Sequence, residues 1–148
     1  MNISMRQATI NDLENVVGLF NDYRMFYGQK SDIDSAREFL LDKFINLNSV
    51  IFLAESDEGA CGFVQLFPSF SSVSLQKQWI LNDLYVDKEF RGAGIGRMLM
   101  KAAKEFAIAT NSKGLALSTA KTNTLAQKLY ESLGFNKDNE FYHYYLKV

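Results

Sequence analysis

The chain has 148 residues, of which 47% are apolar and 22% are charged, and it carries 12 Phe, 7 Tyr and 1 Trp. This composition excludes a disordered chain, and the length predicts one domain, residues 1–148, around one core. The 17 acidic and 16 basic side chains give a net charge of −1, which excludes a general nucleic-acid binder. The longest apolar run, Val50–Ala54, is too short for a membrane span. We therefore expect a cytoplasmic protein with neither a membrane nor a nucleic acid as partner.

The charge is unevenly distributed along the sequence. Residues 1–60 hold 10 acidic and 5 basic side chains, whereas residues 61–148 hold 7 acidic and 11 basic ones. The basic half is compatible with an anionic ligand and the acidic half with a cationic one, although both are equally compatible with ordinary solvated surfaces. Charge alone leaves these alternatives open.

The elements of the first half follow from hydrophobic periodicity. In chain order we first predict a strand at 3–7 and a helix from Leu13 that stops at Gly28, with Asn11 and Asp12 as capping candidates. A second helix is predicted to open at Ser31 or Asp32 and to reach Phe44. Strands at 50–55 and 61–67 follow. The two strands are separated by a short turn at 56–59, which predicts an antiparallel hairpin.

The second half alternates strands and helices. In chain order we predict a strand that is clear from Trp79 to Val86, a helix at 95–111, a short buried strand at 115–119, a helix at 123–133 stopped by Gly134, and one or two strands over 135–148. This order predicts an α/β chain of the α+β mixed-sheet kind, with about six to seven strands and about four helices. Antiparallel pairing comes first and a βαβ crossover follows.

The turn between strand 79–86 and helix 95–111 is the most informative segment. It contains Gly92, Gly94 and Gly96 together with Arg91 and Arg97. Glycine lets main-chain amides approach a ligand closely, and a helix start adds unsatisfied N–H donors and a partial positive charge. These features predict a phosphate or pyrophosphate cradle, the alternative being a tight turn without a ligand.

Two common nucleotide motifs are absent from this turn. A dinucleotide fingerprint needs Gly or Ala where this chain has Arg97, counting from Gly92, or Leu99, counting from Gly94. The Gly-Lys-Ser/Thr ending of a Walker A loop is missing as well. A nucleotide-binding protein is therefore disfavoured.

A family resemblance rests on two sequence blocks in order. Arg91-x-x-Gly94-x-Gly96 after Leu84-Tyr85-Val86, followed by Asn123-x-x-Ala126-x-x-x-Tyr130-x-x-x-Gly134-Phe135, resembles the acetyl-CoA motifs of the GNAT N-acetyltransferase superfamily. The close resemblance covers about residues 81–135. Within the superfamily the chain looks most like the small subgroup related to yeast histone and polyamine acetyltransferases.

The resemblance implies acetyl-CoA as co-substrate, no metal, and a homodimer. In the family, the loop amides hold the CoA pyrophosphate and the preceding strand offers backbone groups to the pantetheine arm. The residues that it implies for acetyl-CoA binding are Leu84, Tyr85, Val86, Arg91, Gly92, Ala93, Gly94, Ile95, Gly96, Arg97, Asn123 and Tyr130.

The resemblance also implies catalytic roles. Tyr130 stands at the position of the family's general acid, seven residues after Asn123 and so on nearly the same helical face; its alternative is a ring packed in the core. Some polyamine-acetylating relatives have a glutamate base where this chain has Asn82, which cannot take a proton. Asp83 is the candidate base if a bulge re-aims its side chain, the alternative being deprotonation through water. The implied oxyanion donor is a backbone N–H near Leu84.

The acceptor is expected to bind at Tyr23, Phe26 and Tyr27 together with Asn82 and Asp83. Aromatic faces beside carboxylates suit a cationic amine, although a core helix end followed by a solvated loop gives the same pattern. We predict direct acetyl transfer to a primary amine, such as a polyamine, a lysine side chain or another small amine, in a ternary complex. The alternative is a non-catalytic acyl-CoA-binding sensor of the same fold.

Two reactive residue types are not assigned roles. His143 has no companion ligand nearby in the sequence and is expected to pack or to face water. Cys61, the single cysteine, excludes a Cys-based zinc site and is expected to be a small buried hydrophobe.

Overall fold

The computed structural model describes residues 2–148, which fall into two compact units, up to Leu117 and from Ser118 onward. The first unit contains β1 (Ser4–Gln7), α1 (Leu13–Phe26), α2 (Ile33–Asn46), β2 (Val50–Ser56), β3 (Gly59–Ser71), β4 (Gln76–Val86), α3 (Ile95–Ala109) and β5 (Leu115–Ala116). The second unit contains α4 (Thr124–Ser132). Each unit is described by itself below.

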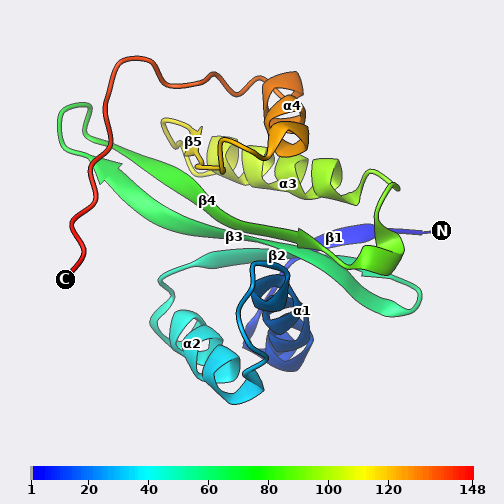
Figure 1. The fold of residues 1–148 in the computed structure, drawn as a ribbon. Coiled ribbons are helices and arrows are strands. Elements are labelled where there is room, and N and C mark those ends of the chain that lie inside the picture. The colour runs from blue at the N-terminus through cyan, green and yellow to red at the C-terminus, as the bar shows by residue number, and fades with distance from the viewer. Residues whose placement is uncertain (1) are drawn as a thin grey trace. The chain divides into compact units, whose positions relative to one another are not determined.

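The first unit is a mixed sheet with helices on both faces. Its strands lie in the order β1-β2-β3-β4-β5, with antiparallel pairing from β1 to β4 and parallel pairing between β4 and β5. Figure 1 shows α1 and α2 on one face of the sheet and α3 on the other. The connection from β4 through α3 to β5 is the predicted βαβ crossover, and the α+β fold class is confirmed.

The face under α1 and α2 holds the main hydrophobic core. Its apolar side chains in α1 recur at the helical spacing seen in the sequence and pack on alternate residues of β2 and β3. The members with no measurable exposure are Val16, Leu40, Leu53 and Phe63. Aromatic contacts extend this core, since the rings of Phe20 and Phe63 are 6.1 Å apart.

The opposite face packs against α3. Leu99 and Ala103 are fully buried, while the Phe106 ring lies 5.2 Å from the Trp79 ring and 5.5 Å from the Phe52 ring. Because alternate strand residues face opposite sides, β2, β3 and β4 supply side chains to both layers. β4 thus has one side toward α3 and the other toward α1.

The start of α1 differs in part from the prediction. A 3-10 turn (Ile10–Asp12) with Thr9 as its N-cap precedes the helix. Of the two capping candidates, Asp12 and not Asn11 occupies the N-cap position of α1, although the Asp12 side chain makes no cap hydrogen bond to the helix. Asp12 completes a capping box, since its Oδ2 accepts the Thr9 amide at 2.8 Å, and its carboxylate also binds Arg6. In α2, by contrast, Asp32 is the cap as predicted and accepts the Ser35 amide at 3.1 Å.

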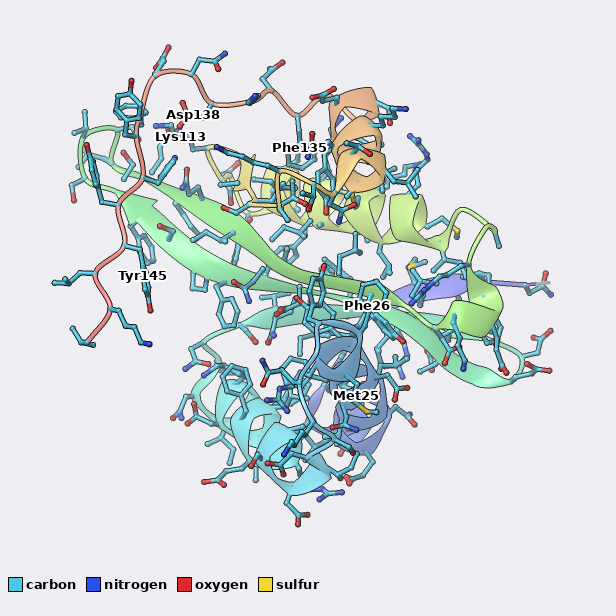
Figure 2. The ribbon with its side chains drawn as sticks, viewed as in Figure 1. Met25, Phe26, Lys113, Phe135, Asp138 and Tyr145 are labelled. Carbon is cyan, nitrogen blue, oxygen red and sulfur yellow. The ribbon has the colours of Figure 1, made fainter. Side chains whose placement is uncertain are left out.

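The C-terminal strands predicted over 135–148 are not formed. The described residues contain five strands instead of six to seven, and β5 has two partly exposed residues instead of a buried strand over 115–119. In the C-terminal aromatic run, Tyr142 and Tyr145 are each about 90% exposed, and Figure 2 labels Tyr145. β-propensity describes the fit to a half-buried pleated surface, and this segment has no strand partner that would provide one.

Two further observations concern the ends of the elements. Gly134 follows α4 with φ 95°, the left-handed conformation that the predicted helix stop requires. Among residues 2–148, no helix is both long enough and apolar enough to cross a membrane.

Candidate active site

The glycine turn leads from β4 into α3 with two residues in the left-handed region. Gly92 has φ 83° and Gly94 φ 79°, and a Cβ added to either would meet open space. Gly94 is the N-cap of α3 and, having no side chain, leaves the first amides of the helix uncapped. Uncapped amides and the helix dipole favour an anion at this point, so the residues present fit the pyrophosphate of acetyl-CoA.

The strand that enters the turn has an open edge. β5 pairs only with residues 79–80 of β4, so beyond them this edge has no strand partner within the described part of the first unit. The Asp87 amide donates to the Cys61 carbonyl at 2.8 Å on the other edge. Because main-chain groups alternate between the edges of a strand, those of Leu84 and Val86 point to the open edge. An extended arm such as pantetheine can pair with these groups.

A β-bulge interrupts β4 just before this edge. Gln65 of β3 pairs with Asp83, and the next residue, Leu66, pairs with Leu81, so Asn82 is the extra residue. Without the bulge, Asp83 would share the α3 face with Leu81, because residues two apart lie on one side. The bulge places Asp83 on the α1 and α2 face instead.

Asp83 is 6% exposed and held by two amides. Its Oδ2 accepts Gln65 Nε2 at 2.8 Å and Asn82 Nδ2 at 3.0 Å. Gln65 in turn accepts the Ser49 hydroxyl on Oε1 at 2.9 Å. The amide of Asn82 cannot act as a base because it cannot take a proton. In the structure Asn82 instead donates a hydrogen bond to the neighbouring Asp83 carboxylate.

The aromatic residues at the end of α1 gather on the same sheet face. The Tyr23 ring lies 5.7 Å from Phe63 and 6.0 Å from Tyr85, and the Phe26 ring lies 6.3 Å from Tyr85. Tyr27 joins them at 5.1 Å from Tyr23. Figure 2 shows Phe26 at the sheet side of α1. The structure thus brings together the three aromatic residues that the sequence assigned to the acceptor.

Tyr85 belongs to this aromatic cluster through its ring, while its main chain pairs with Phe63. Burial raises the pKa of the Tyr85 phenol above its ordinary value, and the Asp22 carboxylate adds to the rise. The phenol is therefore neutral at physiological pH. Asp83 lies two residues before Tyr85 on the same face of β4. The Asp83 carboxylate is therefore next to the aromatic cluster.

Arg91 links the glycine turn to the aromatic cluster. Its guanidinium lies 5.1 Å from the Phe26 ring centre and 5.5 Å from that of Tyr85, and its Nε donates to the Val86 carbonyl at 3.0 Å. Such stacking favours Arg over Lys because the guanidinium is planar. Arg91 therefore contacts both the turn predicted to hold the pyrophosphate and the aromatic residues predicted to bind the acceptor.

The second unit carries the other two predicted residues. Asn123 caps α4, its Oδ1 accepting the Ala126 amide at 3.2 Å. Tyr130 is half-buried, and its ring lies 6.0 Å from that of Phe135. Its assignment as general acid stays a prediction.

The two unassigned reactive residues lie as the sequence suggested. Cys61 has no measurable exposure, its Sγ lies 3.4 Å from the Ala54 carbonyl, and burial raises the pKa of its thiol. His143 is exposed, with Nε2 3.3 Å from Asp138. Among residues 2–148, His, Cys, Asp and Glu side chains form no group of three or more suited to a metal ion.

The sequence analysis did not identify Gln65, which donates a hydrogen bond to Asp83, or Ser49, which donates one to Gln65. A signal was present, because Gln65 is the one polar residue within the apolar stretch 63–67. A buried amide requires hydrogen-bond partners, and a polar residue in a central strand therefore points to a partner across the sheet. Which partner it meets depends on the bulge, which the sequence does not locate.

Comparisons with known proteins agree with this geometry. The family model "Acetyltransferase (GNAT) domain" matches residues 48–137. The uncharacterized N-acetyltransferase YhfO of Bacillus subtilis is 43% identical over 146 residues, covering 99% of this chain and 98% of the relative. A probable acetyltransferase of Haemophilus influenzae is 34% identical over 125 residues, covering 84% of each chain.

A solved structure is equally similar. The crystal structure of a probable acetyltransferase superposes with a TM-score of 0.92 at 44% identity, covering 100% of this chain and 98% of the other. The family model covers more than half of the chain, and the curated relatives align over most of it. The chain therefore belongs to the GNAT family and is an acetyl-CoA-dependent N-acetyltransferase.

Proposed function

We propose that this enzyme, with residues 1–148 working as one catalytic domain, transfers the acetyl group directly to a cationic primary amine. Polyamines, lysine side chains and other small amines are the acceptor class. The observation that carries the proposal is the bulge at Asn82, because it aims Asp83 toward the sheet face of the aromatic cluster. The resemblance to histone and polyamine acetyltransferases supports the same class.

The acceptor side suits an ammonium group for two physical reasons. The faces of Tyr23, Phe26 and Tyr27 attract a cation through their ring quadrupoles. Asp83 offers a carboxylate, and Asp22 lies close enough to raise the pKa of the Tyr85 phenol. A cation leaving water for this surface thus meets aromatic faces and the carboxylates of Asp83 and Asp22, which outnumber the one guanidinium, that of Arg91, stacked on Phe26.

Binding of acetyl-CoA is assigned to the first unit and to Asn123. The amides of residues 92–97, together with Arg91 and Arg97, hold the pyrophosphate at the uncapped start of α3. The outward Leu84 carbonyl and Val86 N–H pair with the pantetheine arm along the open edge, which leaves the Leu84 N–H free for the acetyl oxygen. When bound, acetyl-CoA supplies an activated thioester carbonyl.

The chain's residues then manage the protons. Asp83, directly or through a water, takes a proton from the ammonium so that a neutral amine attacks. The Leu84 N–H donates to the oxygen that becomes negative. As the C–N bond forms and the C–S bond breaks, Tyr130 gives its hydroxyl proton to the leaving thiolate and recovers one from the nitrogen. The products are an acetamide, CoA thiol and one released proton.

The experiment is a measurement of CoA thiol release from acetyl-CoA over a panel of acceptors. The panel contains a polyamine, a lysine-containing peptide, an aminoglycoside and an uncharged alcohol of similar size. We expect release with at least one amine and none with the alcohol. Acetyl-CoA binding without release across all amines would support the non-catalytic sensor and overturn the proposal.

We also propose that the enzyme is a homodimer. The exposed aromatic C-terminal segment supports this, since Tyr142 and Tyr144 are each at least 90% exposed and large apolar patches mark contact surfaces. Light scattering on the purified protein should give twice the 16.8 kDa chain mass. A mass that stays at one chain across concentrations would contradict it.

A further inference from the structure

Gln65 is a buried primary amide whose hydrogen bonds are directed at Asp83. The residue has no measurable exposure and lies in β3, the central strand of the sheet. Such an amide costs free energy unless its oxygen and nitrogen both find partners. Here Oε1 accepts from Ser49 and Nε2 donates to Asp83.

The contacts fix the direction in which the amide points. Turned over, Gln65 would present its carbonyl oxygen to the carboxylate of Asp83, an acceptor against an acceptor. The Ser49 hydroxyl, 2.9 Å from Oε1, donates to the oxygen and so holds the N–H side toward Asp83. Ser49, which fixes the orientation of the Gln65 amide, lies between α2 and β2. It therefore comes from a different segment of the chain than the bulge at Asn82 in β4.

The two oxygens of Asp83 are consequently not equivalent. Oδ2 accepts both amide donors, whereas Oδ1 accepts no hydrogen bond from residues 2–148. In this range the fully buried side-chain polar atoms that lack a partner are Arg24 Nη1 and Ser74 Oγ. Neither atom belongs to Asp83, which keeps 6% of its surface exposed, so a lone pair of Oδ1 is available.

We propose that Gln65, anchored by Ser49, is a positioning residue that binds Oδ2 of Asp83 and leaves Oδ1 as the oxygen that takes the acceptor's proton. The inference rests on the proposed role of Asp83 as base. Gln65 does not touch the acceptor; it acts by restricting rotation of the carboxylate. Orientation matters because a proton acceptor misplaced by about 1 Å can lose on the order of 10²-fold in rate.

The test is a double-mutant cycle with Gln65→Met and Asp83→Asn. Met has nearly the shape of Gln and keeps the site packed while removing both polar groups. For Gln65→Met alone we expect kcat to fall about tenfold with an unchanged KM for acetyl-CoA. In the Asp83→Asn background, Gln65→Met should cause no further loss, because a residue acting through Asp83 has nothing left to position.

Two more variants keep the test decisive. Ser49→Ala should lower kcat by a smaller factor than Gln65→Met, and this loss should also disappear in the Asp83→Asn background. If Gln65→Met does not fold, Ser49→Ala tests the positioning role in its place. Gln76→Met, at the exposed start of β4, is the matched control and should retain the wild-type kcat.

The outcomes separate the two levels of the argument. Full kcat in both Gln65→Met and Ser49→Ala, or equal losses with and without Asp83, would overturn the positioning role. If Asp83→Asn itself keeps the wild-type kcat, the assignment of Asp83 as base fails. If no amine yields CoA thiol, the proposed acceptor class fails, whichever residues are changed.

Discussion

Gln65 and Asp83 face each other across β3 and β4, with Gln65 Nε2 2.8 Å from Asp83 Oδ2. The contact exists because one extra residue, Asn82, turns the following carboxylate to the other face of the sheet. A regular strand would bury Asp83 against α3, where β3 presents Val64 and Leu66. A local irregularity of the backbone therefore decides which face of the sheet Asp83 occupies.

The first prediction concerns the base. Asp83→Asn keeps the size of the side chain and an oxygen for Gln65, but it removes the proton acceptor. We expect kcat to fall about 10²-fold or more, with little change in the KM for acetyl-CoA. Steady-state kinetics with a saturating amine measures both constants. Asp57→Asn, in the exposed turn between β2 and β3, is the matched control, and an equal loss there would point to an effect unrelated to the site.

The second prediction concerns the acid. Tyr130→Phe removes one hydroxyl and keeps the ring that lies 6.0 Å from Phe135, so α4 should keep its packing. We expect turnover to fall about 10²-fold while acetyl-CoA affinity, measured by calorimetry, stays the same. Tyr142→Phe, at a 90% exposed position, should be silent. Unchanged turnover in Tyr130→Phe would mean that the thiolate leaves without this donor.

The sequence predicted the local turns and helix ends of this site better than the pairing between its strands. Glycine spacing located the turn into α3 and Gly134 the end of α4, because these depend on local backbone conformation. The bulge, and with it the side of the sheet that Asp83 faces, depends on the register between β3 and β4, which is a long-range property. The strands predicted after Gly134 failed for a related reason, since alternating aromatics do not specify a partner edge.

The third prediction concerns stability at low pH. The bond to Arg6 lowers the pKa of Asp12 to about 2, against the partly opposing effect of burial. The unfolded chain binds this proton near pH 4, so the stabilisation is complete above that pH and is lost as pH falls from 4 toward 2. Because Arg6 is half-exposed and screened, we expect about 1–2 kcal/mol.

Urea unfolding of the wild type and Asp12→Asn at pH 7 and pH 2.5 measures this contribution. The wild type should be more stable by that amount at pH 7, and the difference should shrink at pH 2.5. Asp34→Asn is the control, because its partner Arg37 and its own carboxylate are exposed and such pairs contribute about 0–1 kcal/mol. A pH-independent difference for Asp12→Asn would assign the loss to the capping geometry instead of the charge.

The last prediction separates two glycines by their backbone conformation. Gly94 has φ 79° and opens α3, whereas Gly18 lies within α1 on its exposed side. Gly94→Ala forces a residue with a Cβ into the left-handed conformation, which costs about 1–2 kcal/mol, and the added Cβ lies in open space at the start of α3. We therefore expect a lower unfolding midpoint and a KM for acetyl-CoA raised about tenfold, since a 1.4 kcal/mol loss of binding is tenfold.

Gly18→Ala is the matched substitution with the opposite expectation. A helical residue with nothing within 4 Å of its added Cβ should gain about 0.5–1 kcal/mol of stability from helix propensity. Its KM for acetyl-CoA should not change, because α1 lies on the other face of the sheet from α3 (Figure 1). Chemical unfolding and acetyl-CoA kinetics on both variants give the comparison. If Gly94→Ala loses stability but keeps its KM, the turn needs glycine for its fold alone, and acetyl-CoA must be held by other groups.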